Sequence, residues 1–421
     1  MPAAVHAATV CLRTCQGYTD DPLDVQRTPD HSFPTRMTER HPMIDRPPRI
    51  LQLLPALGDG GVERGTVEMA AYLAEKGIEN WTASAGGALL APLEATGTHH
   101  VDLKVGRKSP FAIHANAGRL ARLIDENEID IVHARSRAPA WAGWLAAARA
   151  RRRPRFMTTF HGVYSHGNRF KRAYAGVMLK GPLVVANSAF IRDHIISVYG
   201  YPAERIILAP RGVDAAVFDP GRLSSEDIAL ARAELGADDR TPLIVIVGRI
   251  TDWKGHRYLI ESLAFAENKR FRLAIVGSGS AGVIGELETL VAELDLGDRV
   301  TIAGSRRDIP AVMAAADIAV SASVRPEAFG RVAIEAEVMG TPVIATNHGG
   351  SLETVIDGKT GYLVPPANPK ALADAIDAAL SDPEGLKEMG RAARAHVLAN
   401  FTVETMLEKE FSAYERLMAA G

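Results

Sequence analysis

The feature that most constrains this chain is a unit that repeats along it: a short apolar run, a glycine-rich turn, and apolar residues at helical spacing. The first unit starts with the apolar run Ile50–Leu54. The turn Gly58-Asp59-Gly60-Gly61 follows, and then the helical positions Val62, Thr66, Met69, Ala70 and Leu73. Strands and helices that alternate in this way form parallel sheets covered by helices on both faces. The chain is therefore predicted to be an α/β protein.

The unit recurs in two blocks. In the first block, further strands are predicted at Ile129–Ala134, Phe156–Phe160 and Leu183–Ala186, with helices at 138–150, 169–179 and 189–199. In the second block, strands are predicted at Leu243–Val247, Leu273–Val276, Val300–Ala303, Ile318–Ser321 and Val343–Ala345. Pro and Gly interrupt the pattern between the blocks. Two doubly wound, Rossmann-like domains are the simplest account.

The same patterns divide the chain into five segments. Residues 1–46 show neither strand nor helix periodicity and are predicted to be a disordered extension. A later start is the alternative, because Met37 and Met43 precede the first strand. The first domain is predicted at 47–210, a hinge linker at 211–222 and the second domain at 223–400. Residues 401–421 contain a helix that lies too far from the last strand to be a crossover within the second sheet.

Composition excludes several classes of protein. The 421 residues are 47% hydrophobic, enough for two or three buried cores. Lys plus Arg (48) and Asp plus Glu (50) nearly balance, giving a net charge of −2, which argues against a polycationic nucleic-acid binder. The only cysteines are Cys11 and Cys15, which favours a reducing compartment. No run is long and apolar enough for a membrane helix, and the N-terminus lacks the basic region of a secretory signal. A cytoplasmic location is therefore expected.

One glycine motif suggests dinucleotide binding. Residues Gly277 to Gly282 form a G-x-G-x-x-G run directly after a predicted strand. The full Rossmann signal also needs an acidic residue at the end of the next strand, but Asp298 precedes that strand. The run also lies in the second strand–helix unit of its domain rather than the first. We therefore interpret it as a tight turn that lets a ligand approach the backbone.

Two cations follow the first strand of the second domain. Arg249 and Lys254 lie in Gly248-Arg249-Ile250-Thr251-Asp252-Trp253-Lys254-Gly255, at the carboxyl end of that strand. Ligands of α/β folds bind at this edge, and two cations beside a helix N-terminus suit a diphosphate. The alternative is a pair of solvated loop charges.

Two glutamates, Glu327 and Glu335, stand eight residues apart across a loop and the first turns of an apolar helix. The face of Glu335 also carries Val332, Val338 and Met339, a costly place for an unpartnered carboxylate. A ligand hydroxyl would satisfy it; an internal Arg or Lys is the alternative. The strand after this helix runs into the pair Gly349-Gly350, and Glu353 follows.

Taken together, these motifs resemble a known family. Over roughly residues 48–420 the chain is similar to family 4 retaining glycosyltransferases of the GT-B fold. The matching features are Gly60-Gly61, Phe160-His161-Gly162, Ala186-Asn187-Ser188, Pro210-Arg211-Gly212-Val213-Asp214, Gly248-Arg249 with Lys254-Gly255, and the Glu327–Glu335 spacing. The surroundings of His161 and Lys254 are similar, more loosely, to bacterial lipopolysaccharide-core enzymes. The resemblance implies two domains facing a cleft and a C-terminal helix that crosses back to the first domain.

The resemblance also implies roles for matching residues. Arg249 and Lys254 would neutralise the leaving nucleoside diphosphate, Glu327 would bind the donor sugar, and Glu335 the ribose. His161 would contact the sugar near its anomeric centre, and Gly60 and Gly61 would offer backbone N–H groups to the phosphate. Further donor-binding positions would be Gly248, Gly277, Phe329 and Gly330.

No cofactor or metal is expected. Cations and N–H dipoles can stabilise a departing diphosphate without a metal ion. Metal-dependent transferases of the other common fold carry an Asp-x-Asp, and this sequence has none. His161 and His166 could form a metal pair, but the context favours a sugar contact for His161. No Ser-His-Asp or Cys-His nucleophile arrangement is recognisable.

A basic cluster follows the helix predicted at 138–150. It comprises Arg149, Arg151, Arg152, Arg153 and Arg155, and continues in Arg169, Lys171 and Arg172. It is either a solvated helix end or a surface for anionic membrane headgroups or a phosphorylated glycolipid. Nucleic acid is disfavoured because no aromatic residues alternate with the charges.

The sequence thus predicts a retaining glycosyltransferase with a UDP- or GDP-linked sugar donor. The acceptor would be a glycan or glycolipid of lipopolysaccharide or cell-envelope biosynthesis. By elimination, the first domain would select this acceptor, and the enzyme would lie in the cytoplasm or peripherally on the inner membrane face. A nucleotide-sugar epimerase, a phosphorylase of similar shape and a non-catalytic nucleotide- or sugar-binding protein are the alternatives.

Overall fold

The computed structural model describes residues 46–58, 60–164 and 167–419. The described residues belong to one compact unit, 44–420. The predicted extension therefore lies outside the described residues except for Arg46, and so do Cys11, Cys15, Asp59 and His166.

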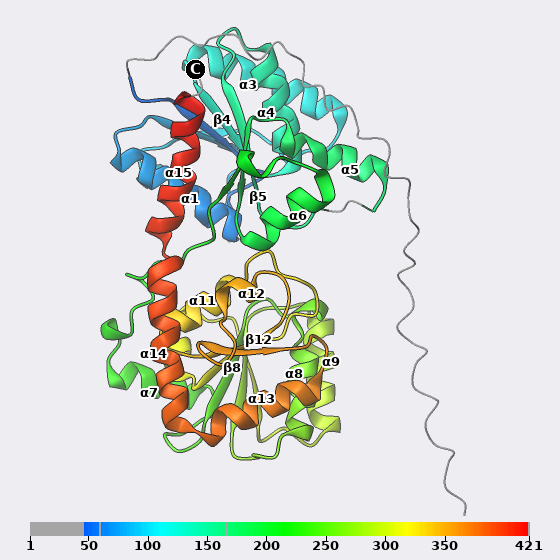
Figure 1. The fold of residues 1–421 in the computed structure, drawn as a ribbon, viewed down its shortest axis with the longest axis vertical. Helices are drawn as coiled ribbons and strands as arrows, with labels where there is room; N and C mark the ends of the chain where they lie inside the picture. Colours follow the sequence, from blue (N-terminus) through cyan, green and yellow to red (C-terminus); the bar gives the residue numbers. More distant parts are fainter. Residues whose placement is uncertain (1–45, 59, 165–166, 420–421) are drawn as a thin grey trace, which may run out of the picture. The chain divides into compact units, whose positions relative to one another are not determined.

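The first domain contains a seven-stranded parallel sheet (Figure 1). Its strand order is β3-β2-β1-β4-β5-β6-β7. The strands are β1 (Ile50–Leu53), β2 (Asn80–Ser84), β3 (His99–Asp102), β4 (Ile131–Ala134), β5 (Arg155–Phe160), β6 (Leu183–Ala186) and β7 (Ile206–Leu208). The order reverses between β1 and β4, which creates the switch point where doubly wound sheets bind ligands.

The first domain's helices connect these strands. They are α1 (Gly61–Glu75), α2 (Leu90–Ala95), α3 (Pro110–Glu126), α4 (Arg137–Arg149), α5 (Arg169–Ala175) and α6 (Ala189–Tyr199). Strands β1, β2, β4 and β6 are buried over their whole length, as expected for strands covered on both faces.

The second domain repeats the topology with six parallel strands in the order β10-β9-β8-β11-β12-β13. These are β8 (Leu243–Val247), β9 (Arg272–Val276), β10 (Val300–Gly304), β11 (Ile318–Ser321), β12 (Val343–Thr346) and β13 (Gly361–Val364). The helices are α7 (Ser225–Glu234), α8 (His256–Phe265), α9 (Ala281–Glu293), α10 (Ile309–Ala315), α11 (Arg331–Val338), α12 (Ser351–Thr354), α13 (Pro369–Ser381) and α14 (Pro383–Asn400). The prediction of two doubly wound domains is confirmed.

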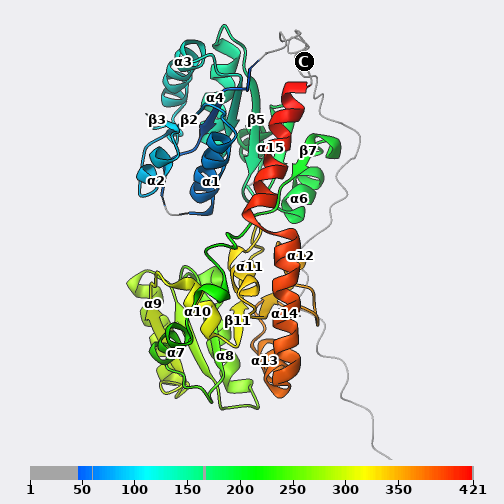
Figure 2. The ribbon, with the colours of Figure 1, turned by 90° about the vertical axis from the view of Figure 1, so that its left-hand side faces the viewer.

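The last helix, α15 (Val403–Ala419), returns to the first domain. It contacts β6, β7 and α1. It lies beside α1 in Figure 1 and beside β7 in Figure 2. Its buried residues Met406, Ala413, Tyr414 and Leu417 join a core cluster with Ile50 and other residues of the first sheet. The predicted crossing-back of the C-terminal helix is therefore confirmed.

The start of the predicted linker is packed: residues 211–213 are buried, whereas residues 214–222 are half-buried or exposed. Val213 is fully buried, and its backbone pairs with the segment that leads into α15: its N–H donates to Phe401 and its carbonyl accepts from Val403. The two stretches of chain that pass between the domains therefore lie side by side and are hydrogen-bonded to each other.

Candidate functional site

The loop after β8 carries the predicted diphosphate cations. Arg249 is exposed, directly after Gly248, and no ion pair is found for it among the described residues. Lys254 is half-buried, and its Nζ lies 2.8 Å from Oε1 of Glu327. The Ser323 hydroxyl donates to the same carboxylate oxygen at 2.5 Å. The structure therefore brings together two residues that were predicted from separate motifs.

Two predicted donor-binding glycines meet at the strand ends. The N–H of Gly248 donates to Val276 at 2.9 Å, and Gly277 follows Val276 directly. Gly277 has φ of 154°, and a Cβ there would overlap the carbonyl oxygen of Gly248. Only glycine fits this close approach. Ser280 caps α9 and β10 ends at Gly304, so the acidic residue that dinucleotide binding needs is absent from that strand end.

Glu335 has the internal cation that the sequence left as an alternative. Nε of Arg331, four residues earlier on α11, lies 3.6 Å from its Oε1. A Cβ at Gly61 would lie 3.7 Å from Cδ of Arg331, so the glycine turn before α1 and the start of α11 are adjacent. The contact of Glu335 with a ribose stays a prediction.

Of the two glutamates Glu335 and Glu337 on α11, Glu337 is the one without a cation partner among the described residues. Glu337 is fully buried, and no ion pair is found for it among the described residues. Burial raises the pKa of Glu337 well above its usual value, and the hydroxyl of Thr360 opposes the shift only in part. Sequence patterns singled out only Glu335, but α11 is buried on more than one face, so Glu337 is enclosed as well.

Phe329 and Gly330 lie between Glu327 and α11. The ring of Phe329 is 3% exposed and packs edge-on against Phe401, with centroids 5.5 Å apart. Its side chain is therefore part of the core, and only its backbone is left for the predicted donor contact. Gly330 has φ of 88° and begins α11, and the N–H of Gly350 donates to the carbonyl of Glu327, which fixes that loop.

His161 follows β5 at the carboxyl edge of the first sheet. Nη2 of Arg211 lies 2.7 Å from its Nδ1. Burial, and then the charges of Arg211 and Arg135, lower the pKa of His161 well below its usual value. His161 is therefore neutral near pH 7. A neutral imidazole can still form a hydrogen bond with a sugar, so this charge state is compatible with the predicted contact.

Several polar residues near the site had no role in the sequence interpretation. Arg135 is 1% exposed at the end of β4 and bonds to both Gln52 and Glu410 of α15. Glu353 accepts hydrogen bonds from the first N–H groups of α6, those of Ala189 and Phe190. Their partners are distant in sequence, so spacing rules could not reveal them.

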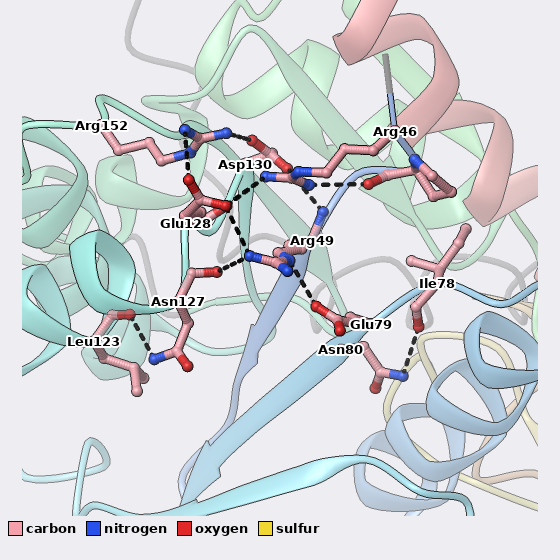
Figure 3. Close-up of polar contacts among 11 residues, drawn as sticks. Arg46, Arg49, Ile78, Glu79, Asn80, Leu123, Asn127, Glu128, Asp130 and Arg152 are labelled. Carbon is pink, nitrogen blue, oxygen red and sulfur yellow. Dashed lines mark hydrogen bonds and ion pairs between the residues drawn. The ribbon is translucent and has the colours of Figure 1, made fainter. Parts of the chain in front are cut away.

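The basic cluster is partly neutralised inside the protein. Arg152 pairs with Asp130, which is nearly buried, and lies near Glu128 (Figure 3). Arg46 pairs with both acids, whereas Arg49 pairs with Glu128 and its backbone N–H donates to Asp130. Arg149 bonds to His114, while the Arg151 side chain is 92% exposed. The exposed part of the cluster is therefore smaller than the sequence suggests.

Among the described residues, no group of three or more His, Cys, Asp or Glu side chains is placed to hold a metal ion. No helix within the described ranges combines the length and the apolar character needed to cross a membrane.

Comparison with known proteins identifies relatives of both domains. Residues 59–217 match the family "Glycosyltransferase Family 4", and residues 227–396 match "Glycosyl transferases group 1". A glycosyltransferase from Rickettsia africae ESF-5 is similar in structure with 38% identity and a TM-score of 0.82, over 88% of this chain and 99% of that one.

Two further relatives are more distant or only partly matched. Anabaena Alr3699/HepE, crystallised with UDP-glucose, has 26% identity and a TM-score of 0.75, over 88% of this chain and 99% of that one. A D-inositol 3-phosphate glycosyltransferase of Nocardia farcinica is 35% identical over 250 residues, 56% of this chain and 54% of the relative. The chain thus spans about half the length of the curated relatives it matches.

Proposed function

Because the chain belongs to the glycosyltransferase family, with group 1 and family 4 regions, we propose that it transfers a sugar from a nucleotide-sugar donor to a glycan or glycolipid acceptor. The observation that carries the proposal is the arrangement after β8. There an unpaired Arg249 and a Lys254 held by Glu327 lie at the edge where α/β folds bind ligands. The UDP-glucose of the Anabaena relative supports a nucleotide-sugar donor.

The proposed chemistry follows from the charges. Cleavage of the bond between the anomeric carbon and the phosphate oxygen leaves a nucleoside diphosphate, on which negative charge grows. Arg249 and Lys254 stabilise that charge, because preorganised cations lower a barrier most where charge develops. As the diphosphate draws Lys254 toward itself, Glu327 is freed for the donor sugar.

The stereochemistry and the absence of a metal are further parts of the proposal. The acceptor hydroxyl attacks from the face that the diphosphate leaves and passes its proton to an oxygen of the departing diphosphate, so the product keeps the anomeric configuration of the donor. With two cations at the leaving group, turnover needs no divalent ion. EDTA should therefore leave the rate unchanged. Loss of turnover in EDTA that Mg²⁺ restores would overturn this part.

Binding is tested before turnover. Thermal-shift measurements with UDP, GDP and ADP identify which nucleoside diphosphate the protein binds. Turnover is then assayed with sugar nucleotides that carry the same nucleobase. NMR of the product reads the anomeric configuration. Stabilisation by a nucleotide without any turnover across acceptors would favour a binding protein. Inversion of a stereocentre within the donor sugar, without transfer of that sugar to an acceptor, would favour an epimerase.

The acceptor is proposed to be anionic, as in a lipid-linked or lipopolysaccharide glycan, and to bind the first domain near an anionic membrane surface. The exposed cations Arg151, Arg153, Arg169 and Lys171 support this, because basic residues near such a surface attract it.

A further inference from the structure

The contact between Arg211 and His161 determines where the histidine carries its proton. Nη2 of Arg211 lies 2.7 Å from Nδ1 of His161. A guanidinium has only N–H donors and no acceptor, so Nδ1 must accept with its lone pair. A neutral imidazole with a free lone pair on Nδ1 carries its proton on Nε2.

The other ring nitrogen has no partner. Nε2 of His161 is buried, and no hydrogen bond reaches it from the described residues. A buried N–H without an acceptor costs free energy that a ligand oxygen would recover. His256, His348 and His396 also have buried ring nitrogens without a hydrogen-bond partner among the described residues, so the missing partner alone does not mark a ligand position. At His161 it coincides with a place at the carboxyl edge of the first sheet, where ligands of such folds bind.

We propose that Arg211 is a positioning residue: it locks His161 into the neutral tautomer with the proton on Nε2. His161 then donates a hydrogen bond to an oxygen of the bound sugar donor and does not act as a base. The nature of that ligand rests on the proposed function, whereas the tautomer does not.

Arg211 is itself held from three sides. A Cβ at Gly65 of α1 would overlap its Nη1, and that atom also lies 3.6 Å from the sulfur of Met406 on α15. The backbone N–H of Arg211 donates to the carbonyl of Asn187, after β6. The guanidinium therefore has little room to turn away from His161.

The charges around this pair also favour a neutral histidine. Burial, followed by the charges of Arg211, Arg135 and His133, lowers the pKa of His161. The carboxylates of Glu410 on α15 and Glu68 on α1 face Arg211, as do the cations Arg135 and Arg331. Burial lowers the pKa of Arg211 to about 10, so Arg211 still carries its charge near neutral pH and a second charge on His161 would be repelled.

The first test reads the tautomer directly. The protein is labelled with ¹⁵N-histidine, and two-bond nitrogen–proton spectra are recorded, with His161→Gln used to assign the signal. The wild-type spectrum should show a proton on Nε2 and none on Nδ1. In Arg211→Met we expect a mixture of tautomers and a higher pKa for His161. A wild-type proton on Nδ1 would overturn the proposal, as would an unchanged tautomer in Arg211→Met.

Two further variants protect this test against a loss of folding. Gly65→Ala keeps the arginine but displaces its guanidinium, and it should shift the same His161 signal. Arg122→Met, at an exposed position of α3, is the matched control and should leave the signal unchanged. If Arg211→Met does not fold, the wild-type tautomer and Gly65→Ala still decide the question.

The second test concerns the direction of the hydrogen bond. His161→Gln keeps an N–H donor and should retain more turnover than His161→Leu. Arg211→Met should lower kcat about tenfold or more, because the wrong tautomer presents a lone pair to the ligand. It should also introduce a pH dependence that follows the raised pKa of His161. Equal rates for the Gln and Leu variants would contradict donation, whereas absence of turnover in the wild type would contradict the proposed function alone.

Discussion

The two domains share a topology but treat polar side chains in opposite ways. In the first domain, polar groups near the strand ends are buried and paired with α15: Arg135 bonds to Glu410, and His133 bonds to Tyr414 at 2.7 Å. In the second domain, Arg249 is exposed and Lys254 finds its partner within the same domain. The difference teaches that the first sheet's edge uses most of its polar groups for structure and leaves Nε2 of His161 for a ligand, while the second sheet's edge keeps cations available.

The first domain's pairs should therefore determine stability. Replacing Glu410 by Gln leaves Arg135 buried with an uncompensated charge, and we expect a loss of about 3–5 kcal/mol in the free energy of unfolding. Replacing both residues, as in Arg135→Met with Glu410→Leu, should recover much of the loss. Urea denaturation measures both effects. The exposed pair Arg192–Asp193 is the control, and Arg192→Met should cost no more than about 1 kcal/mol.

The second domain's cations should instead determine turnover. We expect Arg249→Ala and Lys254→Ala each to lower kcat about 10²-fold or more, because each removes charge stabilisation from the leaving diphosphate. Their urea midpoints should stay close to wild type, since neither side chain is fully buried. Steady-state kinetics with the identified donor measures the loss. Near-wild-type rates in both variants would remove the basis for the diphosphate site.

Glu337 is the exception that sharpens the comparison, because it is a buried, uncompensated acid in the second domain. Its pKa is raised on folding, so above about pH 4.5 the unfolded chain releases a proton that the folded chain keeps. The contribution of Glu337 to stability is therefore present below that pH and is lost as pH rises toward its folded pKa. Glu337→Gln should raise the melting temperature at pH 8 more than at pH 5. An equal shift at both values would mean that Glu337 does not titrate on unfolding.

Local sequence patterns were sufficient for the fold. The predicted strands Leu183–Ala186, Leu243–Val247 and Ile318–Ser321 have the same bounds as β6, β8 and β11. The strands without a prediction were β2, β3, β7 and β13. In β2, Asn80, Thr82 and Ser84 leave no apolar run, and β3 consists of His99, His100, Val101 and Asp102, half of them exposed. These two strands are defined by their neighbours in the sheet rather than by their own composition.

The candidate site was predictable only where its residues follow strands of the same sheet. Glu327 and Lys254 each follow a strand of the same sheet, so their approach could be expected from topology. The pairing of Arg211 with His161 depends on how α15 and the linker pack against the first sheet, which no residue spacing encodes. The motif that contains Arg211 could be recognised in the sequence, but the contact of its guanidinium with His161 could not.

The smallest expected effect concerns the exposed remainder of the basic cluster in the first domain. Replacing Arg152 would break its pair with the nearly buried Asp130, so loss of folding would confuse the result. Arg151→Ser with Arg153→Ser removes only exposed side chains. At about 1 kcal/mol per residue near an anionic surface, the double variant should bind anionic vesicles roughly 30-fold more weakly at low salt. Co-sedimentation measures vesicle binding, and nucleotide binding should be unchanged.

Vesicle binding by the wild type should also weaken as salt rises, because the attraction falls off within a Debye length of about 8–10 Å. Equal vesicle binding by both proteins would mean that these arginines form only a solvated helix end and that the exposed charges of the first domain bind no membrane surface.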